Sequence, residues 1–139
     1  MTTTLIRNAD VIVTMDGTRR ELSGASILVV DGAIVAIGPA LSAPDAEVID
    51  ATGCVITPGL VNTHHPLFQS LTRAVPGGQD ALLFGWLRTL YPIWARYTPH
   101  DMHISTQLGL AELALSGCTM SSDHLYLFPN GATLDDTIH

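Results

Sequence analysis

Two adjacent histidines, His64 and His65, follow a short apolar run that extends from Cys54 to Val61. An apolar run that ends abruptly in polar residues is typical of a buried strand whose C-terminal end opens into a site. Imidazole is a common metal ligand, and two histidines separated by one residue on a strand point the same way and can bind one metal ion. The segment 57–69 therefore indicates a metal site at the end of a strand.

A second polar pair, Asp123 and His124, ends another short apolar stretch at 118–122. The long segment between the two strands carries helical patterns, and a strand, helix, strand order predicts parallel strands. The carboxyl ends of parallel strands lie at one edge, so both polar clusters are expected there. Because two parallel strands cannot close a barrel or bury both of their faces, we expect the chain to be the N-terminal part of a larger α/β protein.

Residues 1–57 contain short β-branched runs bounded by Gly, Asp and Pro, which predict strands. The dipeptide Asp31-Gly32 between two of these runs predicts a two-residue hairpin, because Gly tolerates positive φ. We expect a small antiparallel β layer that serves as a scaffold and that ends at Pro58-Gly59. The expected strands include residues 5–6, 11–13, 27–30, 34–37 and 47–49.

The connection between the two parallel strands begins with a loop at 66–78 and continues with a helix at about 80–90, which Pro92 is expected to kink or end. A second helix has a clear start signal, because Thr98 can cap it and Asp101 stands three residues later. We expect this helix to end at Gly117.

Composition excludes several classes of function. The net charge of −7 and only six Lys and Arg residues argue against a nucleic-acid surface. No apolar run is long enough to span a membrane, and the N-terminus lacks the pattern of a signal peptide. Cys54 and Cys118 each lie in an apolar stretch, which predicts buried free thiols and a cytoplasmic protein.

The segment Pro58-Gly-Leu-Val-Asn-Thr-His64, after a β-rich region, resembles the first barrel strand of the amidohydrolase superfamily of metal-dependent hydrolases. Further blocks in the same order resemble the branch that contains 8-oxoguanine deaminase and hydroxydechloroatrazine ethylaminohydrolase. They include Phe68-Gln-Ser-Leu-Thr-Arg-Ala74, Leu83-Phe-Gly-Trp-Leu-Arg-Thr-Leu-Tyr-Pro92 and Asp123-His-Leu-Tyr-Leu-Phe-Pro129. The resemblance covers essentially the whole chain.

This resemblance implies an α/β protein in which residues 1–57 form part of a small β-sandwich lobe and residues 58–139 form the first two β/α units of a (β/α)8 TIM-like barrel. It implies one divalent metal, zinc in preference to iron, held by a His-x-His pair and by residues of later strands. The implied reaction is the hydrolytic deamination of a small N-heterocycle, an 8-oxoguanine-like purine or a hydroxy-s-triazine, by metal-activated water. The acid/base groups would also lie on later strands, so no catalytic residue is expected within this chain. The complete protein is expected to be a homo-oligomer.

The resemblance assigns His64 as the first metal ligand, whereas the position of the second ligand is occupied by Pro66. Proline has no lone pair for a metal, and His65 cannot replace it on a regular strand because adjacent residues point to opposite faces. A bulge or a register shift would be needed. Two interpretations therefore stay open: part of an active aminohydrolase, or a non-catalytic homologue or fragment with an impaired metal site, in which this chain alone is inactive.

Five further residues are candidates for substrate binding, and each has a structural alternative. Gln69 and Arg73 lie in the loop after the strand, where they could instead only bond the loop itself. Trp86 could stack on a heterocycle or belong to the core. Asp123 and His124, at the end of the second strand, could contact the substrate or support a metal ligand.

Overall fold

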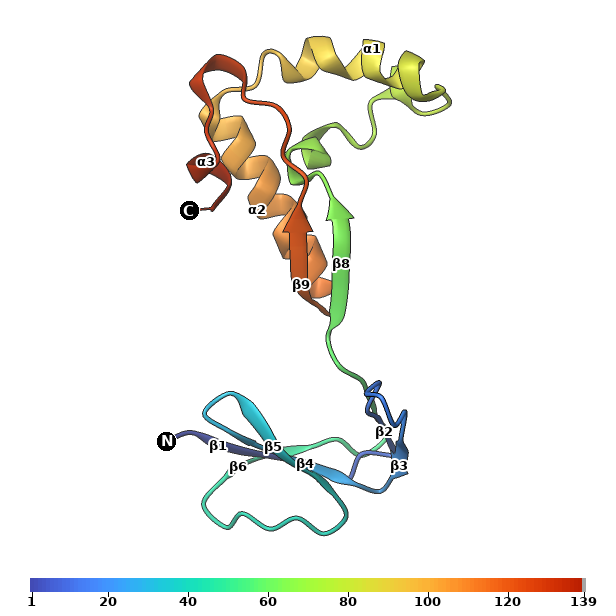
Figure 1. The fold of residues 1–139 in the computed structure, drawn as a ribbon, viewed down its shortest axis with the longest axis vertical. Coiled ribbons are helices and arrows are strands. Elements are labelled where there is room, and N and C mark those ends of the chain that lie inside the picture. The colour runs from blue at the N-terminus through green and yellow to red at the C-terminus, as the bar shows by residue number, and fades with distance from the viewer. Residues whose placement is uncertain (139) are drawn as a thin grey trace. The chain divides into compact units, whose positions relative to one another are not determined.

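The computed structural model describes residues 1–138, and His139, the last residue of the predicted barrel segment, lies outside them. The chain divides into two compact units, Met1–Pro58 and Gly59–His139. Seven short strands make up the first unit, whereas the second combines a pair of strands with helices (Figure 1).

The first unit contains two small sheets that share one apolar core. One has the strand order β5-β4-β1-β6 and the other has the order β3-β2-β7. Apolar residues of both sheets line the core, among them Ile12 on β2 and Ile27 on β4. The bounds are β1 (Thr3–Arg7), β2 (Val11–Val13), β3 (Glu21–Ser23), β4 (Ser26–Val30), β5 (Ala33–Gly38), β6 (Glu47–Asp50) and β7 (Val55–Ile56).

Pairing within these sheets is mixed, so the expectation of one antiparallel layer is wrong. The pairs β1–β4, β4–β5 and β2–β3 are antiparallel, whereas β6 runs parallel to β1 and β7 runs parallel to β2. A parallel pair needs a long connection, which local turn signals cannot reveal. The Asp31-Gly32 hairpin is confirmed, because both residues have positive φ, 48° and 81°, as a tight hairpin turn of this kind requires.

The second unit is organised around β8 (Leu60–His65) and β9 (Cys118–Asp123), which pair in parallel as predicted. Their connection contains η1 (Leu67–Thr72), η2 (Pro76–Gly78), α1 (Leu83–Trp94) and α2 (Pro99–Leu115), and β9 is followed by η3 (Pro129–Gly131) and α3 (Asp135–Ile138). The helix α2 runs beside the two strands and packs against η1 and β9 (Figure 1). This packing places η1 directly beyond the end of β8.

The predicted cap of α2 is confirmed. Thr98 Oγ1 accepts a hydrogen bond from the backbone N–H of Asp101 at 3.2 Å, and the Thr98 backbone N–H donates to Asp101 Oδ2 at 2.7 Å. For α1, Pro92 was expected to kink or end the helix. It does not end it, because Pro92 lies inside the helix, which continues to Trp94. The backbone N–H of Ala95 donates to the carbonyl of Tyr91 at 2.8 Å, so helical bonding resumes directly after the proline. The fully buried Trp94 side chain favours this continuation.

The core of the second unit lies between η1, α1 and α2. It is formed by Phe68, Leu90, Trp94, Tyr97, Met102 and Ala132. The strand β8 does not belong to this core, contrary to the expectation of a buried strand: Leu60 and Val61 are 58% and 59% exposed. A strand becomes buried only when layers cover both of its faces, and α2 can cover one.

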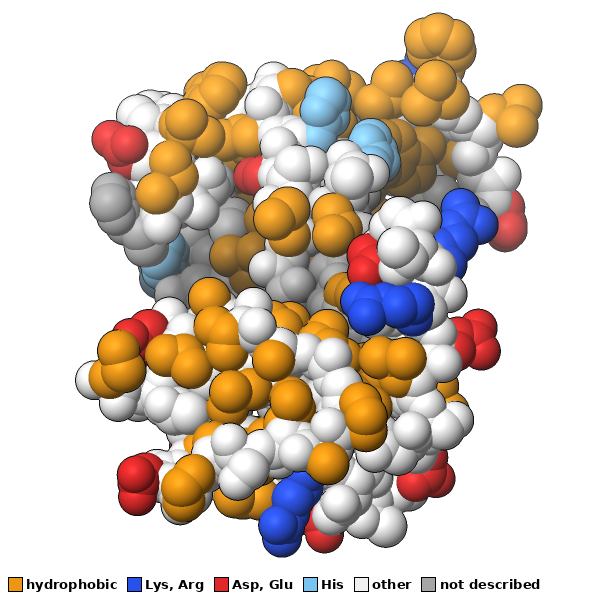
Figure 2. All heavy atoms as spheres, turned by 60° about the horizontal axis from the view of Figure 1, so that its bottom comes forward, with side chains coloured by type: hydrophobic (Ala, Val, Ile, Leu, Met, Phe, Trp, Pro, Cys, Tyr) orange, Lys and Arg blue, Asp and Glu red, His pale blue; other side chains and the backbone are white. Residues whose placement is uncertain are grey.

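Apolar side chains are exposed on both units, as Figure 2 shows for one face. The cysteines are free, as expected, but they are not buried: Cys54 is exposed and Cys118 is partly exposed. Their apolar neighbours in the sequence do not imply burial, because Val55 and Met120 beside them are themselves exposed. None of the helices within residues 1–138 has the length and apolar character needed to cross a bilayer.

Candidate metal centre

A break in strand register shapes the end of β8. Asn62 pairs with Ser121 and His65 pairs with Asp123, so β8 uses one residue more than β9 over this interval. An extra residue of this kind is a β-bulge, and it interrupts the alternation of side chains. Asn62 Nδ2 lies 3.4 Å from His65 Nδ1, which shows that these two side chains share one side of the strand.

The bulge separates the two adjacent histidines. His65 is partly buried against α2, and its Nε2 lies 3.8 Å from the position that a Cβ atom on Gly109 would occupy. His64 is exposed, and its ring lies beside that of His124 with a centroid distance of 5.7 Å and an angle of 37° between the ring planes. The parallel strands thus bring His64 and His124 together, as their common edge predicts.

Pro66 follows directly on β8 with φ −71° and ψ 88° and stands at the start of η1. Its ring offers no ligand atom at this position. Within residues 1–138, no three His, Cys, Asp or Glu side chains come together in a group that could hold a metal ion. Within the described residues, His64 and His124 form hydrogen bonds only through their backbone atoms. Their ring nitrogens are therefore available to bind a metal. Nitrogen donors at a solvent-exposed strand end fit a divalent metal as part of a ligand set.

Asp123 fixes the turn that follows β8. Its Oδ1 accepts a hydrogen bond from the backbone N–H of Leu67 at 2.9 Å. Beyond this turn, Gln69 Nε2 donates to the hydroxyl of Tyr126 at 2.8 Å. Burial raises the pKa of Tyr126, so its hydroxyl stays protonated near neutral pH. Asp123 and Gln69 therefore both join η1 to the end of β9 and the segment after it.

Arg73 contacts α2, whereas Trp86 packs against another residue of its own helix, α1. The Arg73 guanidinium forms a two-pronged ion pair with Glu112 on α2, with Nη2 and Oε1 2.7 Å apart, and its Nε donates to the carbonyl of Ser70. Trp86 is partly buried, and its ring packs edge-on against Trp94 with a centroid distance of 5.3 Å. The bond to Ser70 is the loop contact that was the structural alternative for Arg73, the ion pair with α2 was not expected, and the packing of Trp86 against the core corresponds to its structural alternative.

Two residues in these contacts, Glu112 and Tyr126, were not singled out from the sequence. Hydrogen bonds from Arg73 lower the pKa of Glu112 and keep it charged. The sequence does contain a pattern that could have pointed to Glu112. The helical spacing of Ser105, Gly109 and Glu112 puts these residues on one face of α2, and this face packs against η1. Tyr126 lies two residues after His124, close enough to the strand end to be a candidate.

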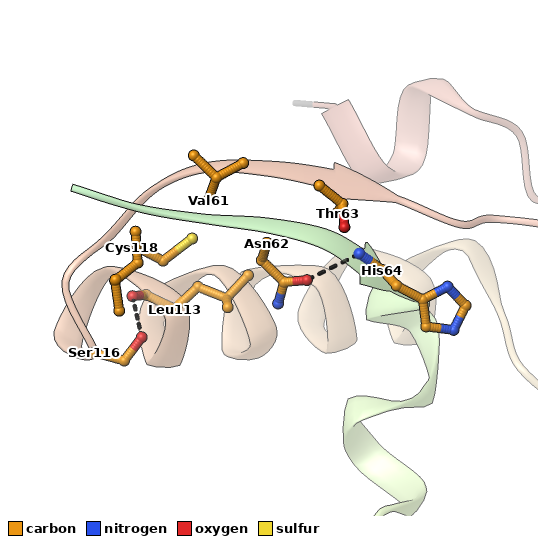
Figure 3. Close-up of a pocket in the computed structure, with 8 residues that line it drawn as sticks. Val61, Asn62, Thr63, His64, Leu113, Ser116 and Cys118 are labelled. Atoms are coloured by element: carbon orange, nitrogen blue, oxygen red, sulfur yellow. Dashed lines mark hydrogen bonds between the residues drawn. The ribbon is translucent and has the colours of Figure 1, made fainter. Parts of the chain in front are cut away.

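A pocket of about 380 Å³ runs along β8 and ends at His64 (Figure 3). It lies between the strand and the C-terminal part of α2, and the His64 ring points away from the other lining side chains. None of the five predicted substrate residues lines this pocket. Its lining consists of Leu60, Val61, Asn62, Thr63, His64, Leu113, Ser116 and Cys118.

Comparison with known proteins identifies relatives, although no family model matches the chain. The chain is 49% identical over 135 residues to 8-oxoguanine deaminase of Pseudomonas aeruginosa, a match that covers 94% of this chain and 29% of that protein. It is 38% identical over 138 residues to hydroxydechloroatrazine ethylaminohydrolase of a Pseudomonas species, covering 91% of this chain and 29% of the relative. The chain is a homologue of amidohydrolase-type deaminases.

Solved structures agree with this relationship. The crystal structure of atrazine chlorohydrolase from Arthrobacter aurescens, complexed with zinc, matches with a TM-score of 0.89 and 30% sequence identity. The match covers 97% of this chain and 32% of that structure. The chain thus spans about 29% of the length of its curated amidohydrolase-type relatives, and about a third of the structural one.

Proposed function

We propose that this chain is the N-terminal part of a metal-dependent aminohydrolase that hydrolytically deaminates an N-heterocycle. The observation that carries the proposal is the 49% identity to an 8-oxoguanine deaminase, combined with the position of His64 at the carboxyl end of β8. In this proposal residues 1–57 belong to a β-sandwich lobe and residues 58–139 supply the first two β/α units of a barrel. The protein acts on a small molecule, in the cytoplasm, as a homo-oligomer.

The roles of the residues follow from their contacts. His64 would hold a divalent metal, with zinc preferred because a zinc complex is known for a structural relative. When bound, such a metal activates water for attack on the ring carbon that bears the leaving amine. The hydrogen bonds made by Asp123 and Gln69 fix η1 beyond the strand end, so these residues position the loop that borders the site. Arg73 anchors that loop to α2 through Glu112.

The substrate class follows from the relatives. One relative is named for 8-oxoguanine and another for hydroxydechloroatrazine, a substituted triazine. Both are flat nitrogen heterocycles with an exocyclic amine. We propose an 8-oxoguanine-like purine as the first substrate to test and a hydroxy-s-triazine as the second.

The test is amine release by the complete zinc-loaded protein, that is, ammonia from the purine and ethylamine from an ethylamino-substituted hydroxy-s-triazine. The variant is His64→Ala, and the matched control is His100→Ala. His100 is an exposed histidine in the first turn of α2. We expect amine release that a chelator abolishes, that His64→Ala lowers by at least about 100-fold, and that His100→Ala preserves. Amine release that is equal in His64→Ala and His100→Ala would contradict the role of His64.

One observation favours a second candidate function, a non-catalytic homologue with an impaired metal site: Pro66 stands where the resemblance expects a ligand. The variant Pro66→His separates the two functions. An impaired site predicts little zinc and no turnover in the natural protein and a gain of both in Pro66→His. If Pro66→His changes neither zinc content nor turnover, position 66 is not a ligand position.

A further inference from the structure

We propose that His124 supplies the second imidazole of the metal site, in place of the ligand that Pro66 cannot provide. The inference rests on the proposed function for the presence of a divalent metal, and it adds the residue that completes the pair. It also predicts that the protein binds zinc although position 66 is proline.

The distance between the two rings carries the inference. Zinc lies about 2.0–2.1 Å from an imidazole nitrogen, so two imidazoles on one tetrahedral zinc have ring centroids about 5 Å apart. The centroids of His64 and His124 are 5.7 Å apart. Both side chains are exposed, so rotations about their side-chain bonds can turn one nitrogen of each ring toward a shared metal without moving the strands.

Two other donors near the end of β8 each make a contact of their own through one of their atoms. His65 faces α2 and lies within reach of the Asn62 amide. The Asp123 carboxylate holds the backbone of Leu67. His64 and His124 are the two nitrogen donors whose rings lie side by side at this strand end.

His124 is also held in place by its surroundings, as a ligand should be. Its backbone N–H donates to the carbonyl of His65 at 3.2 Å, which anchors it to the end of β8. Its ring packs against Tyr126 with a centroid distance of 5.4 Å. Tyr126 in turn accepts the hydrogen bond of Gln69 and packs edge-on against the fully buried Phe68. These contacts connect the His124 ring to the core and limit its motion, which lowers the entropic cost of binding a metal.

The test measures Zn²⁺ affinity of the purified protein by competition with a chromophoric chelator. The variants are His64→Ala and His124→Ala, each alone and combined, with His100→Ala as the control. We expect each single variant to weaken Zn²⁺ binding by at least about tenfold. The loss of binding free energy in the double variant should be smaller than the sum of the two single losses. The control should bind Zn²⁺ as the natural protein does. Zn²⁺ affinity in His124→Ala equal to that of the control would overturn the proposal.

A second measurement does not depend on how well the variants fold. In the ¹⁵N NMR spectrum of the natural protein, the ring nitrogens of His64 and His124 should shift together and saturate at one equivalent of Zn²⁺, while those of His100 stay unchanged. A spectrum in which His64 shifts and His124 does not would refute the proposal. Ammonia release from the purine separates the proposed function from the ligand assignment. Zinc bound by both rings without deamination would contradict only the proposed function. Deamination by a protein whose His124 ring nitrogens do not shift on zinc addition would contradict only the ligand assignment.

Discussion

The carboxylate of Asp123 accepts a hydrogen bond from the backbone N–H of Leu67 at 2.9 Å, across 56 positions of the sequence. This bond joins the end of β9 to the first residue of η1. Because Pro66 lies between His64 and Leu67, the bond fixes the path of the chain as it leaves the candidate metal centre. The geometry of that centre therefore depends on a residue that was predicted to contact substrate.

Replacement of Asp123 by Ala should lower the free energy of unfolding by about 1–3 kcal/mol, because it leaves the partly buried N–H of Leu67 without its acceptor. Asp123→Asn should cost less, since its side-chain oxygen can still accept. Urea denaturation measures both. The matched control is Asp80→Ala, an exposed carboxylate in the loop before α1, with an expected change within about 0.5 kcal/mol. Equal effects of Asp123→Ala and Asp80→Ala would show that the bond is not important.

Replacement of Gly109 by Ala should destabilise the second unit, although Ala favours helices. A Cβ atom there would lie 2.7 Å from Leu67 Cδ2 and 2.7 Å from Ser70 Oγ, and both side chains are buried. Overpacking costs about 1–3 kcal/mol, and most of this range lies above the helix-propensity gain of about 1 kcal/mol. We expect a lower melting temperature and weaker zinc binding, because η1 must shift.

The matched control for this variant is Gly85→Ala in the first turn of α1. The nearest atom to its new Cβ would be the Ala81 Cβ at 3.4 Å, an ordinary contact. The helix-propensity gain should then prevail, and the melting temperature should rise. If Gly109→Ala is as stable as Gly85→Ala, the close packing of α2 against η1 is not a constraint.

The ion pair between Arg73 and Glu112 should make stability depend on pH in the acid range. Hydrogen bonds from Arg73 lower the pKa of Glu112 below its ordinary value of 4.5, so the folded state binds this proton less tightly than the unfolded state. The stabilisation is present above pH 4.5 and is lost as the pH falls through the lower folded value. The difference in melting temperature between the natural protein and Glu112→Gln should therefore be largest near neutral pH and should vanish in stronger acid.

Glu47→Gln is a suitable control, because Glu47 is an exposed strand residue that forms no ion pair within the described part of the chain. The difference in melting temperature between Glu47→Gln and the natural protein should not show the loss in acid that is expected for Glu112→Gln. Because the Arg73–Glu112 pair is half exposed, 1 M NaCl should reduce the effect of Glu112→Gln. A difference that is the same at pH 7 and pH 3 would contradict the role of the ion pair.

Replacement of Thr98 by Ala should cost about 1 kcal/mol, because it removes the acceptor for the Asp101 backbone N–H in the first turn of α2. Thr98→Ser keeps the hydroxyl and should retain most of the stability. Chemical denaturation compares the two. Equal losses in Thr98→Ser and Thr98→Ala would show that the cap hydroxyl is unimportant.

Local signals predicted much of the fold. The Thr98 cap and the Asp31-Gly32 turn depend on a few neighbouring residues, and both are confirmed. The parallel pairing of β8 and β9 followed from the length of their connection, and with it the approach of His64 to His124. These predictions succeeded because each uses information contained in a short segment or in chain topology.

Other features depend on contacts between distant residues, which sequence patterns do not record. The bulge that turns His65 toward α2 arises from the pairing of β8 with β9. Arg73 has Glu112 as its partner because α2 packs on η1, although 39 positions separate the two residues. In the first unit, the parallel return of β6 beside β1 was missed because only hairpins have a local turn signal.

The pairing of β8 with β9 has a kinetic consequence. Ser122 Oγ on β9 donates to the carbonyl of Thr63 on β8, and 59 positions separate the two residues. A contact of this span forms only after a long loop has closed, which costs chain entropy before any stabilisation is gained. The helix α2 can form early from local contacts, so the two strand ends that carry His64 and His124 should meet late, and the candidate metal centre should be among the last parts of this unit to assemble during folding.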